Sequence, residues 1–146
     1  RWFQCPAGMT RYSRQSSYIS RGAKMAERAP TTEPLLVVEK YEAFIAYFYR
    51  VAQNIPRQHG VVRDMFLRDL LGQVSLFNDA GKSGQVSKLY AADSGLATLR
   101  FWLRFLAHQD RKLITMKQHQ VGSVMLAEVG KILGSWIRKT QKAGRG

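Results

Sequence analysis

Apolar residues recur every three or four positions along most of the chain, which is the spacing of one face of an α-helix. The pattern begins near residue 35 and predicts four helices, at about 35–55, 61–80, 84–108 and 115–139. No stretch keeps the alternation that is typical of a β-strand. Four helices of about 20–25 residues with short connections predict an all-α fold, an antiparallel four-helix bundle.

Turn and capping residues separate these helices. Pro56 is expected to end the first one, because proline interrupts a helical pattern. Gly81 suits a left-handed cap at the end of the second helix, and Ser83 suits the start of the third. Thr115 and Gln118 have the spacing of a capping box at the start of the fourth.

The third predicted helix is apolar on more than one side. One face carries a stripe at the spacing of a helical core: Leu89, Ala92, Leu96, Leu99, Leu103 and Leu106. Phe101 and Phe105 fall on roughly the opposite side, and Trp102 lies between the two. Because a monomeric bundle normally needs one apolar stripe per helix, we expect Phe101, Trp102 and Phe105 to form an oligomer interface with another copy.

Three glycines, Gly122, Gly130 and Gly134, lie along a strip of the fourth predicted helix. Each costs about 1 kcal/mol relative to alanine in a helix interior. The expected gain is the close approach of a neighbouring helix. The alternative is that the glycines are tolerated weak points.

The chain is strongly basic, with 23 Lys and Arg against 10 Asp and Glu and a net charge of +13. This balance indicates an anionic partner, foremost nucleic acid, with a membrane surface or a ribosome as alternatives. Residues 1–34 lack periodicity and are expected to form a disordered basic arm, in which Met25 is a credible initiator. The bundle is expected over residues 35–139, followed by a basic tail over 140–146.

Candidate catalytic and metal-binding groups are sparse. Cys5 is the single cysteine, so neither an intrachain disulfide nor a cysteine zinc site can form. The three histidines do not stand at metal-ligand spacing. The run 81–83 reads Gly-Lys-Ser like the end of a phosphate-binding loop, but Leu76 stands where that motif needs glycine. We expect no catalytic residues, no metal, no cofactor and no membrane-spanning helix.

Four segments resemble a known family: VEKYEAFIAYFYRVAQNIPRQHG, MFLRDLLGQVSLF, AGKSGQVSKLYAADSGLATLRFWLRFLA and AEVGKILGSWI. Over about 38–137 the chain is similar to the accessory variability determinant (Avd) proteins of diversity-generating retroelements, most specifically in LRFWLRFLA and GQVSKLYAAD. The resemblance implies a four-helix bundle that assembles as a basic, ring-like homopentamer. It also implies a non-enzymatic subunit that binds the retroelement's reverse transcriptase and its RNA or DNA to support mutagenic cDNA synthesis, in the cytoplasm of a bacterium or a phage-infected host.

The same resemblance points to six basic residues as candidates for contact with nucleic acid or the polymerase. They match the basic turn after the first helix, the GKS and QVSK lysines and the LRFWLR arginines: Arg57, Arg63, Lys82, Lys88, Arg100 and Arg104. Other interpretations stay open at this point. The chain could be an oligomeric docking protein without functional RNA contact, a four-helix protein associated with ribosomal RNA, or an enzyme that uses Lys82.

Overall fold

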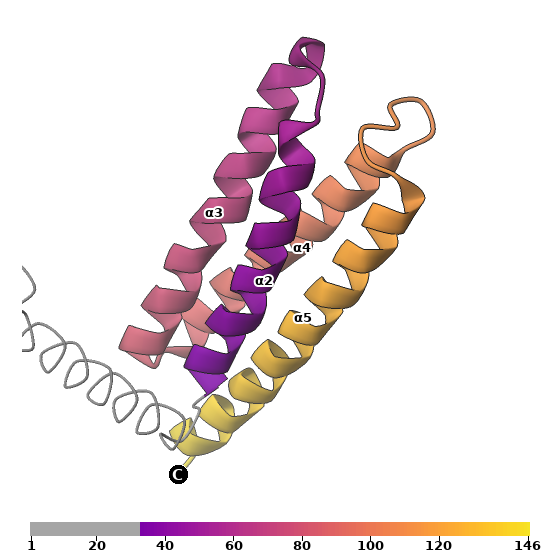
Figure 1. Ribbon diagram of the computed structural model, residues 1–146. Coiled ribbons are helices and arrows are strands. Elements are labelled where there is room, and N and C mark those ends of the chain that lie inside the picture. The colour runs from indigo at the N-terminus through magenta and orange to yellow at the C-terminus, as the bar shows by residue number, and fades with distance from the viewer. Residues whose placement is uncertain (1–32) are drawn as a thin grey trace, which may run out of the picture. The chain divides into compact units, whose positions relative to one another are not determined.

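The computed structural model describes residues 33–146, so the predicted arm, Met25 and Cys5 lie outside the described residues. This part of the chain is helical, with no strand (Figure 1). Its elements in chain order are α2 (Glu33–Gln53), a 3-10 turn η1 (Arg57–His59), α3 (Gly60–Ser83), α4 (Val86–Ala107) and α5 (Met116–Gly144). The predicted all-α fold is confirmed for the described residues.

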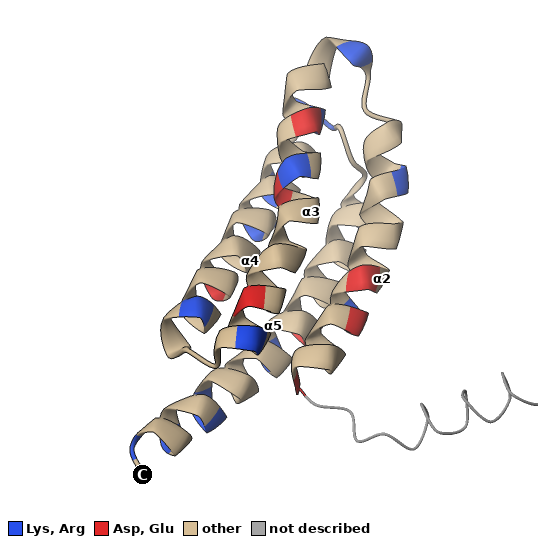
Figure 2. Cartoon of the chain, turned by 90° about the vertical axis from the view of Figure 1, so that its left-hand side faces the viewer, with Lys and Arg blue, Asp and Glu red and all other residues tan. Residues whose placement is uncertain are grey.

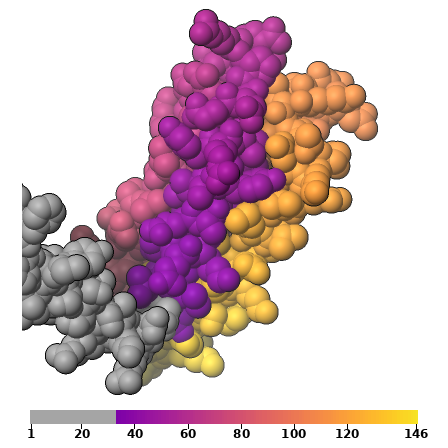
Figure 3. Space-filling model, viewed as in Figure 1, coloured from indigo at the N-terminus to yellow at the C-terminus, as the bar shows by residue number. Residues whose placement is uncertain are grey.

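Each helix packs beside two others in an antiparallel bundle. α2 packs against α3 and α5, and α4 packs against the same two helices from the other side. The η1 turn and the α4–α5 loop lie at one end of the bundle, and the α3–α4 connection lies at the other (Figure 1). The side chains of α2 fill the space between α3 and α5 on the face seen in Figure 3.

The core combines the predicted leucine stripe with a row of aromatic rings. All six stripe residues of α4 are at most 1% exposed. The rings of Phe44, Phe48 and Phe66 follow one another at centroid distances of 4.6 and 6.2 Å, which joins α2 to α3. Tyr41 is fully buried and its hydroxyl donates to the carbonyl of Leu70 at 2.5 Å. Burial raises the pKa of Tyr41, so the hydroxyl stays protonated and keeps this bond.

The α3–α4 junction differs from the prediction. Gly81 and Ser83 both lie inside α3, so their predicted roles as helix cap and helix start are wrong. The left-handed residue is Gly84, with φ of +64° and an N–H that donates to the carbonyl of Ala80 at 3.1 Å. Gln85 then precedes α4 in an extended conformation. Gly84 suits this place because glycine adopts positive φ without a steric penalty.

The start of α5 agrees with the predicted capping box. The Thr115 hydroxyl accepts from the Gln118 N–H at 3.1 Å, and the Gln118 side-chain oxygen accepts from the Thr115 N–H at 2.9 Å. The far end of α5 was predicted too short, because the helix continues to Gly144. The first residues of the predicted tail over 140–146 are therefore helical, and they extend the basic surface of α5.

The glycine strip of α5 has a packing role at one position. A Cβ at Gly122 would lie 2.5 Å from Cζ of Phe48, so the missing side chain lets this ring of α2 approach the α5 backbone. A Cβ at Gly130 would lie 2.7 Å from Nη2 of Arg100 on α4. Nothing lies within 4 Å of a Cβ at Gly134. The expected close helix approach is confirmed at Gly122, whereas Gly130 accommodates a single side chain.

Candidate nucleic-acid interface

Positive charge is distributed unequally between the two halves of the bundle. Residues 33–83 contain six basic and six acidic side chains, whereas residues 84–146 contain eleven basic and three acidic ones. The net charge of the described residues therefore comes from α4, α5 and their loop. Figure 2 shows basic residues gathered at the C-terminal end of α5, and acidic and basic residues mixed on α2 and α3. α4 and α5 pack on each other, and we call this pair of helices, with the loop between them, the cationic side.

The basic residues of α5 account for half of this imbalance, a net +4 of the +8 carried by residues 84–146. They are Lys117, Lys131, Arg138, Lys139 and Lys142, and Glu128 is the one acidic residue of the helix. Within the described residues, Lys139 pairs with Glu33 and the other four cations form no ion pair. None of the five is among the six predicted contacts, although a count of charges helix by helix would have drawn attention to them.

Arg100 and Arg104 lie on α4. Arg100 is half-buried, and Gly130 leaves the room for its guanidinium against α5. Arg104 is exposed in the last turn of α4. Neither forms an ion pair with any residue of the described part of the chain. Unpaired guanidinium groups suit phosphate, which they bind through two parallel hydrogen bonds.

Two of the other predicted contacts lie at the end of the bundle that carries η1. Arg57 is exposed in that turn. Arg63 is partly buried in the first turn of α3 and pairs with its neighbour Asp64 at 3.1 Å. Both belong to the half of the bundle in which the charges balance, so they are weaker candidates for a phosphate surface than the cations of α4 and α5.

The last two predicted contacts, Lys82 and Lys88, flank the α3–α4 connection at the opposite end and are exposed. Lys88 and Arg104 are sixteen positions apart on one helix, which corresponds to about 24 Å at 1.5 Å per residue. The six predicted residues thus form two separated groups in one subunit. A ligand that contacts both groups must be extended, as a nucleic-acid backbone is.

The three predicted interface aromatics have different environments. Trp102 is 7% exposed and its indole N–H donates to Asp69 of α3 at 2.7 Å, so it belongs to the core of its own subunit. Phe105 is partly covered by Arg111, whose guanidinium lies 3.9 Å from the ring centroid. Phe101 is 48% exposed and offers the most surface to a partner. α4 packs against two neighbouring helices, α3 and α5, which explains why its apolar residues cover a wide arc of the helix surface.

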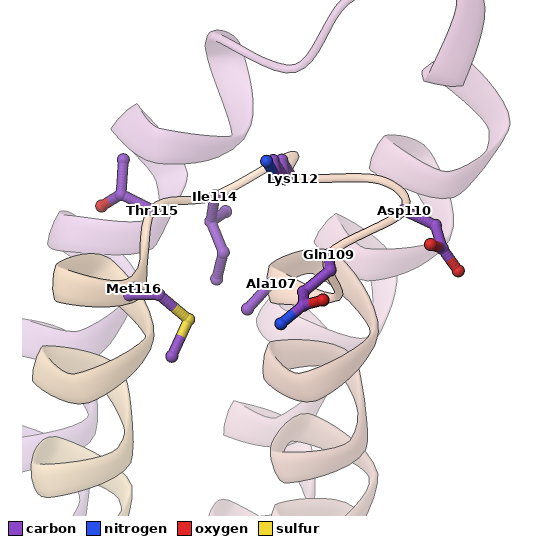
Figure 4. A pocket seen from close by; sticks show the side chains of 7 residues that line it. All are labelled: Ala107, Gln109, Asp110, Lys112, Ile114, Thr115 and Met116. Carbon is purple, nitrogen blue, oxygen red and sulfur yellow. The ribbon is translucent and has the colours of Figure 1, made fainter.

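A hollow of about 710 Å³ lies beside the α4–α5 loop. Gln109, Ile114 and Met116 point towards one another across it, and Asp110 points away (Figure 4). The Asp110 carboxylate instead lies 3.3 Å from Nδ1 of His108. The hollow therefore offers no pair of groups for acid–base chemistry. Within residues 33–146 no cluster of three potential metal ligands occurs, and no helix is long and apolar enough to cross a membrane.

Residues 35–140 match the model of a protein family described as bAvd-like. The chain belongs to the bAvd-like family. This membership confirms the resemblance carried by the LRFWLRFLA and GQVSKLYAAD motifs. It indicates an accessory role in diversity-generating retroelements, since bAvd-like proteins are accessory and non-catalytic. A comparison with curated proteins gave no match.

The family match contains the whole of α3 and α4 and most of α5. All six predicted contact residues and the additional cations Lys117, Lys131, Arg138 and Lys139 lie inside it. Lys142 and Arg145 follow it. The cationic side is therefore largely part of the bAvd-like domain and does not depend on the chain beyond it.

Proposed function

We propose that this chain is a non-enzymatic, homopentameric subunit of a diversity-generating retroelement that binds the reverse transcriptase and its template RNA. The RNA lies on the cationic side formed by α4 and α5. The observation that carries the proposal is the excess of eleven basic over three acidic residues in 84–146, against six and six in 33–83. Association with retroelement components is what bAvd-like membership supports, and the charge distribution supports nucleic acid as one of them.

Phosphate contacts explain how such a surface works. Five copies of the described residues carry a net charge of +40, since each contributes +8. Such a surface binds through phosphates, displaces condensed counterions and weakens steeply as salt rises. Contacts of this kind position a nucleic acid and carry little sequence information. Sequence selection is then left to the polymerase and to the fold of the template RNA.

A comparison of two triple variants tests the RNA surface. Each removes three exposed cations, one set from the cationic side and one from the balanced half: Arg104→Ala/Lys131→Ala/Arg138→Ala and Lys40→Ala/Arg50→Ala/Arg68→Ala. RNA affinity is measured by fluorescence anisotropy across a salt series. Each phosphate contact on a single strand contributes about 0.7 to the steepness with which log K falls against log salt. The first variant loses three such contacts, so its slope should become shallower by about 2. The second should lower it by much less, and an equal loss in both would refute the assignment to α4 and α5.

Light scattering and a polymerase pull-down test the rest of the proposal. A pentamer has five times the subunit mass of 16.6 kDa, and a monomer at micromolar concentration would contradict the assembly. If the first triple variant binds RNA like the unaltered protein and still captures the reverse transcriptase, the chain is a docking protein without functional RNA contact on this side. ATP turnover that is lost in Lys82→Ala would contradict the non-enzymatic assignment.

A further inference from the structure

The side chain of Arg100 crosses from α4 to α5 on the cationic side. It is partly buried, whereas Arg104, one turn further along α4, is exposed. The guanidinium of Arg100 extends to Gly130 of α5, where an added Cβ would lie 2.7 Å from Nη2 and 4.0 Å from Cζ. The tip of this side chain therefore lies beside the backbone of the neighbouring helix.

The N–H groups of Arg100 have no partner within residues 33–146. No ion pair or side-chain hydrogen bond of these residues includes Arg100. Of the three acidic residues of the cationic side, Asp110 and Glu128 contact other basic residues. The third, Asp93, lies seven positions before Arg100 on α4, which corresponds to about 10 Å along the helix axis.

The unpaired N–H groups of Arg100 are accessible to a ligand. No buried side-chain nitrogen or oxygen of the described residues lacks a hydrogen-bond partner, so the unpaired nitrogens of this partly buried residue must reach the surface. A guanidinium binds phosphate through two parallel hydrogen bonds, and the direction of its plane decides which phosphate it can reach. An arginine that already packs against a second helix loses less rotamer freedom when it binds.

We propose that Gly130 is a positioning residue for RNA binding, because it leaves the space that holds the Arg100 guanidinium against α5 in the orientation that binds a phosphate. The inference rests on the RNA surface proposed above. Gly130 has no side chain of its own to offer and acts through Arg100. Glycine weakens a helix interior, and the room that it leaves for this guanidinium is the reason we infer for its place in α5.

Gly130→Ala tests the proposal by adding one methyl group. The new Cβ would be too close to Nη2, and the flexible tip of Arg100 can move away from it, so the guanidinium is displaced while the helix persists. Gly134→Ala is the matched control one turn further along α5, because nothing lies within 4 Å of its Cβ. Both variants replace a helical glycine by alanine, which favours the helix equally.

Affinity for a single-stranded RNA oligonucleotide is measured by fluorescence anisotropy across a salt series. Circular dichroism and light scattering report the helix content and the mass of each variant. We expect Gly130→Ala to bind about tenfold more weakly, the loss of about one charge-assisted hydrogen bond. Its slope of log K against log salt should become shallower by about 0.7 for each Arg100 that contacts the strand. Gly134→Ala should bind like the unaltered protein.

A double variant shows whether the effect passes through Arg100. In an Arg100→Ala background, Gly130→Ala should cause no further loss, since no guanidinium remains to be displaced. An equal loss with and without Arg100 would overturn the positioning role, and so would a changed mass of Gly130→Ala, which would assign Gly130 to subunit packing.

A third contrary result separates this inference from the proposed function. If Gly130→Ala binds RNA like Gly134→Ala while Arg104→Ala/Lys131→Ala/Arg138→Ala binds weakly, the positioning role is wrong and the RNA surface stands. If that triple variant and Arg100→Ala both bind like the unaltered protein, the RNA surface and the positioning role fail together.

Discussion

Gly122→Ala provides a sharp test of how α5 packs in the bundle. The new Cβ would lie 2.5 and 2.7 Å from two atoms of the Phe48 ring and 2.9 Å from Cδ1 of Leu103. Both neighbours are at most 1% exposed. Phe48 also packs against the rings of Phe44, Tyr47 and Phe66, so it has little room to withdraw.

The expected change in the free energy of unfolding follows from two opposing contributions. Overpacking a filled core costs about 1–3 kcal/mol, and contacts this short place Gly122→Ala in the upper part of that range. Replacing glycine by alanine in a helix interior contributes about 1 kcal/mol of stability. We therefore expect a net loss of about 1–2 kcal/mol in the free energy of unfolding. Gly134→Ala experiences only the second contribution, because nothing lies within 4 Å of its Cβ, and it should stabilise by about 1 kcal/mol.

The assay is urea unfolding followed by circular dichroism, at one protein concentration, since assembly shifts apparent stability. The informative quantity is the difference between the two variants, which we expect to be about 2–3 kcal/mol from the same two contributions. Phe48→Leu provides a second arm, because the loss caused by Gly122→Ala should shrink when the ring is absent. Equal stability of Gly122→Ala and Gly134→Ala would refute the account of the α2–α5 contact.

Three further predictions concern other elements. Gly95→Ala should lower the free energy of unfolding by about 1–3 kcal/mol, because its Cβ displaces the Gln73 amide from its buried hydrogen bond; an unchanged urea midpoint would contradict this. Thr115→Ala removes the capping box and should lower the free energy of unfolding by about 1 kcal/mol. Thr115→Ser keeps a hydroxyl at this position and should retain most of the stability. The hydrogen bond from Lys139 lowers the pKa of Glu33 below 4.5, so this pair stabilises the fold above that pH and ceases to do so as pH falls through the lowered pKa. The stability difference between the unaltered protein and Glu33→Gln should therefore shrink on acidification, and a constant difference would contradict the pairing.

The helices could be predicted from the sequence because their apolar spacing reports burial directly. The junction between α3 and α4 could not. Gly81 and Gly84 stand three positions apart and both suit a helix cap. The choice depends on tertiary packing, since a Cβ at Gly81 would lie 3.5 Å from Pro34 and 3.9 Å from Trp136. Gly81 lies inside α3, and the chain reverses at the next glycine, Gly84.

The candidate site, too, could be predicted from the sequence only in part. The net charge of +13 is a property of composition and indicates an anionic partner. Which side of the molecule carries the charge depends on which helices pack together. The resemblance selected residues at both ends of the bundle, and the structure adds the unpaired cations of α5 between them. Trp102 was predicted at an oligomer interface, because its position on a helical wheel does not reveal that α3 covers it.

α4 contributes to two different surfaces. Arg100 projects towards α5, where Gly130 leaves space for it, and Phe101 follows it as an exposed aromatic residue. Successive helical residues differ by about 100° in direction, so adjacent positions can serve separate contacts. The proposed RNA surface and the predicted oligomer contact through Phe101 therefore occupy different sides of one helix. Substitutions at Arg104 should then alter salt-dependent RNA binding without changing the assembly. Substitutions at Phe101 should weaken the assembly more than they weaken RNA binding.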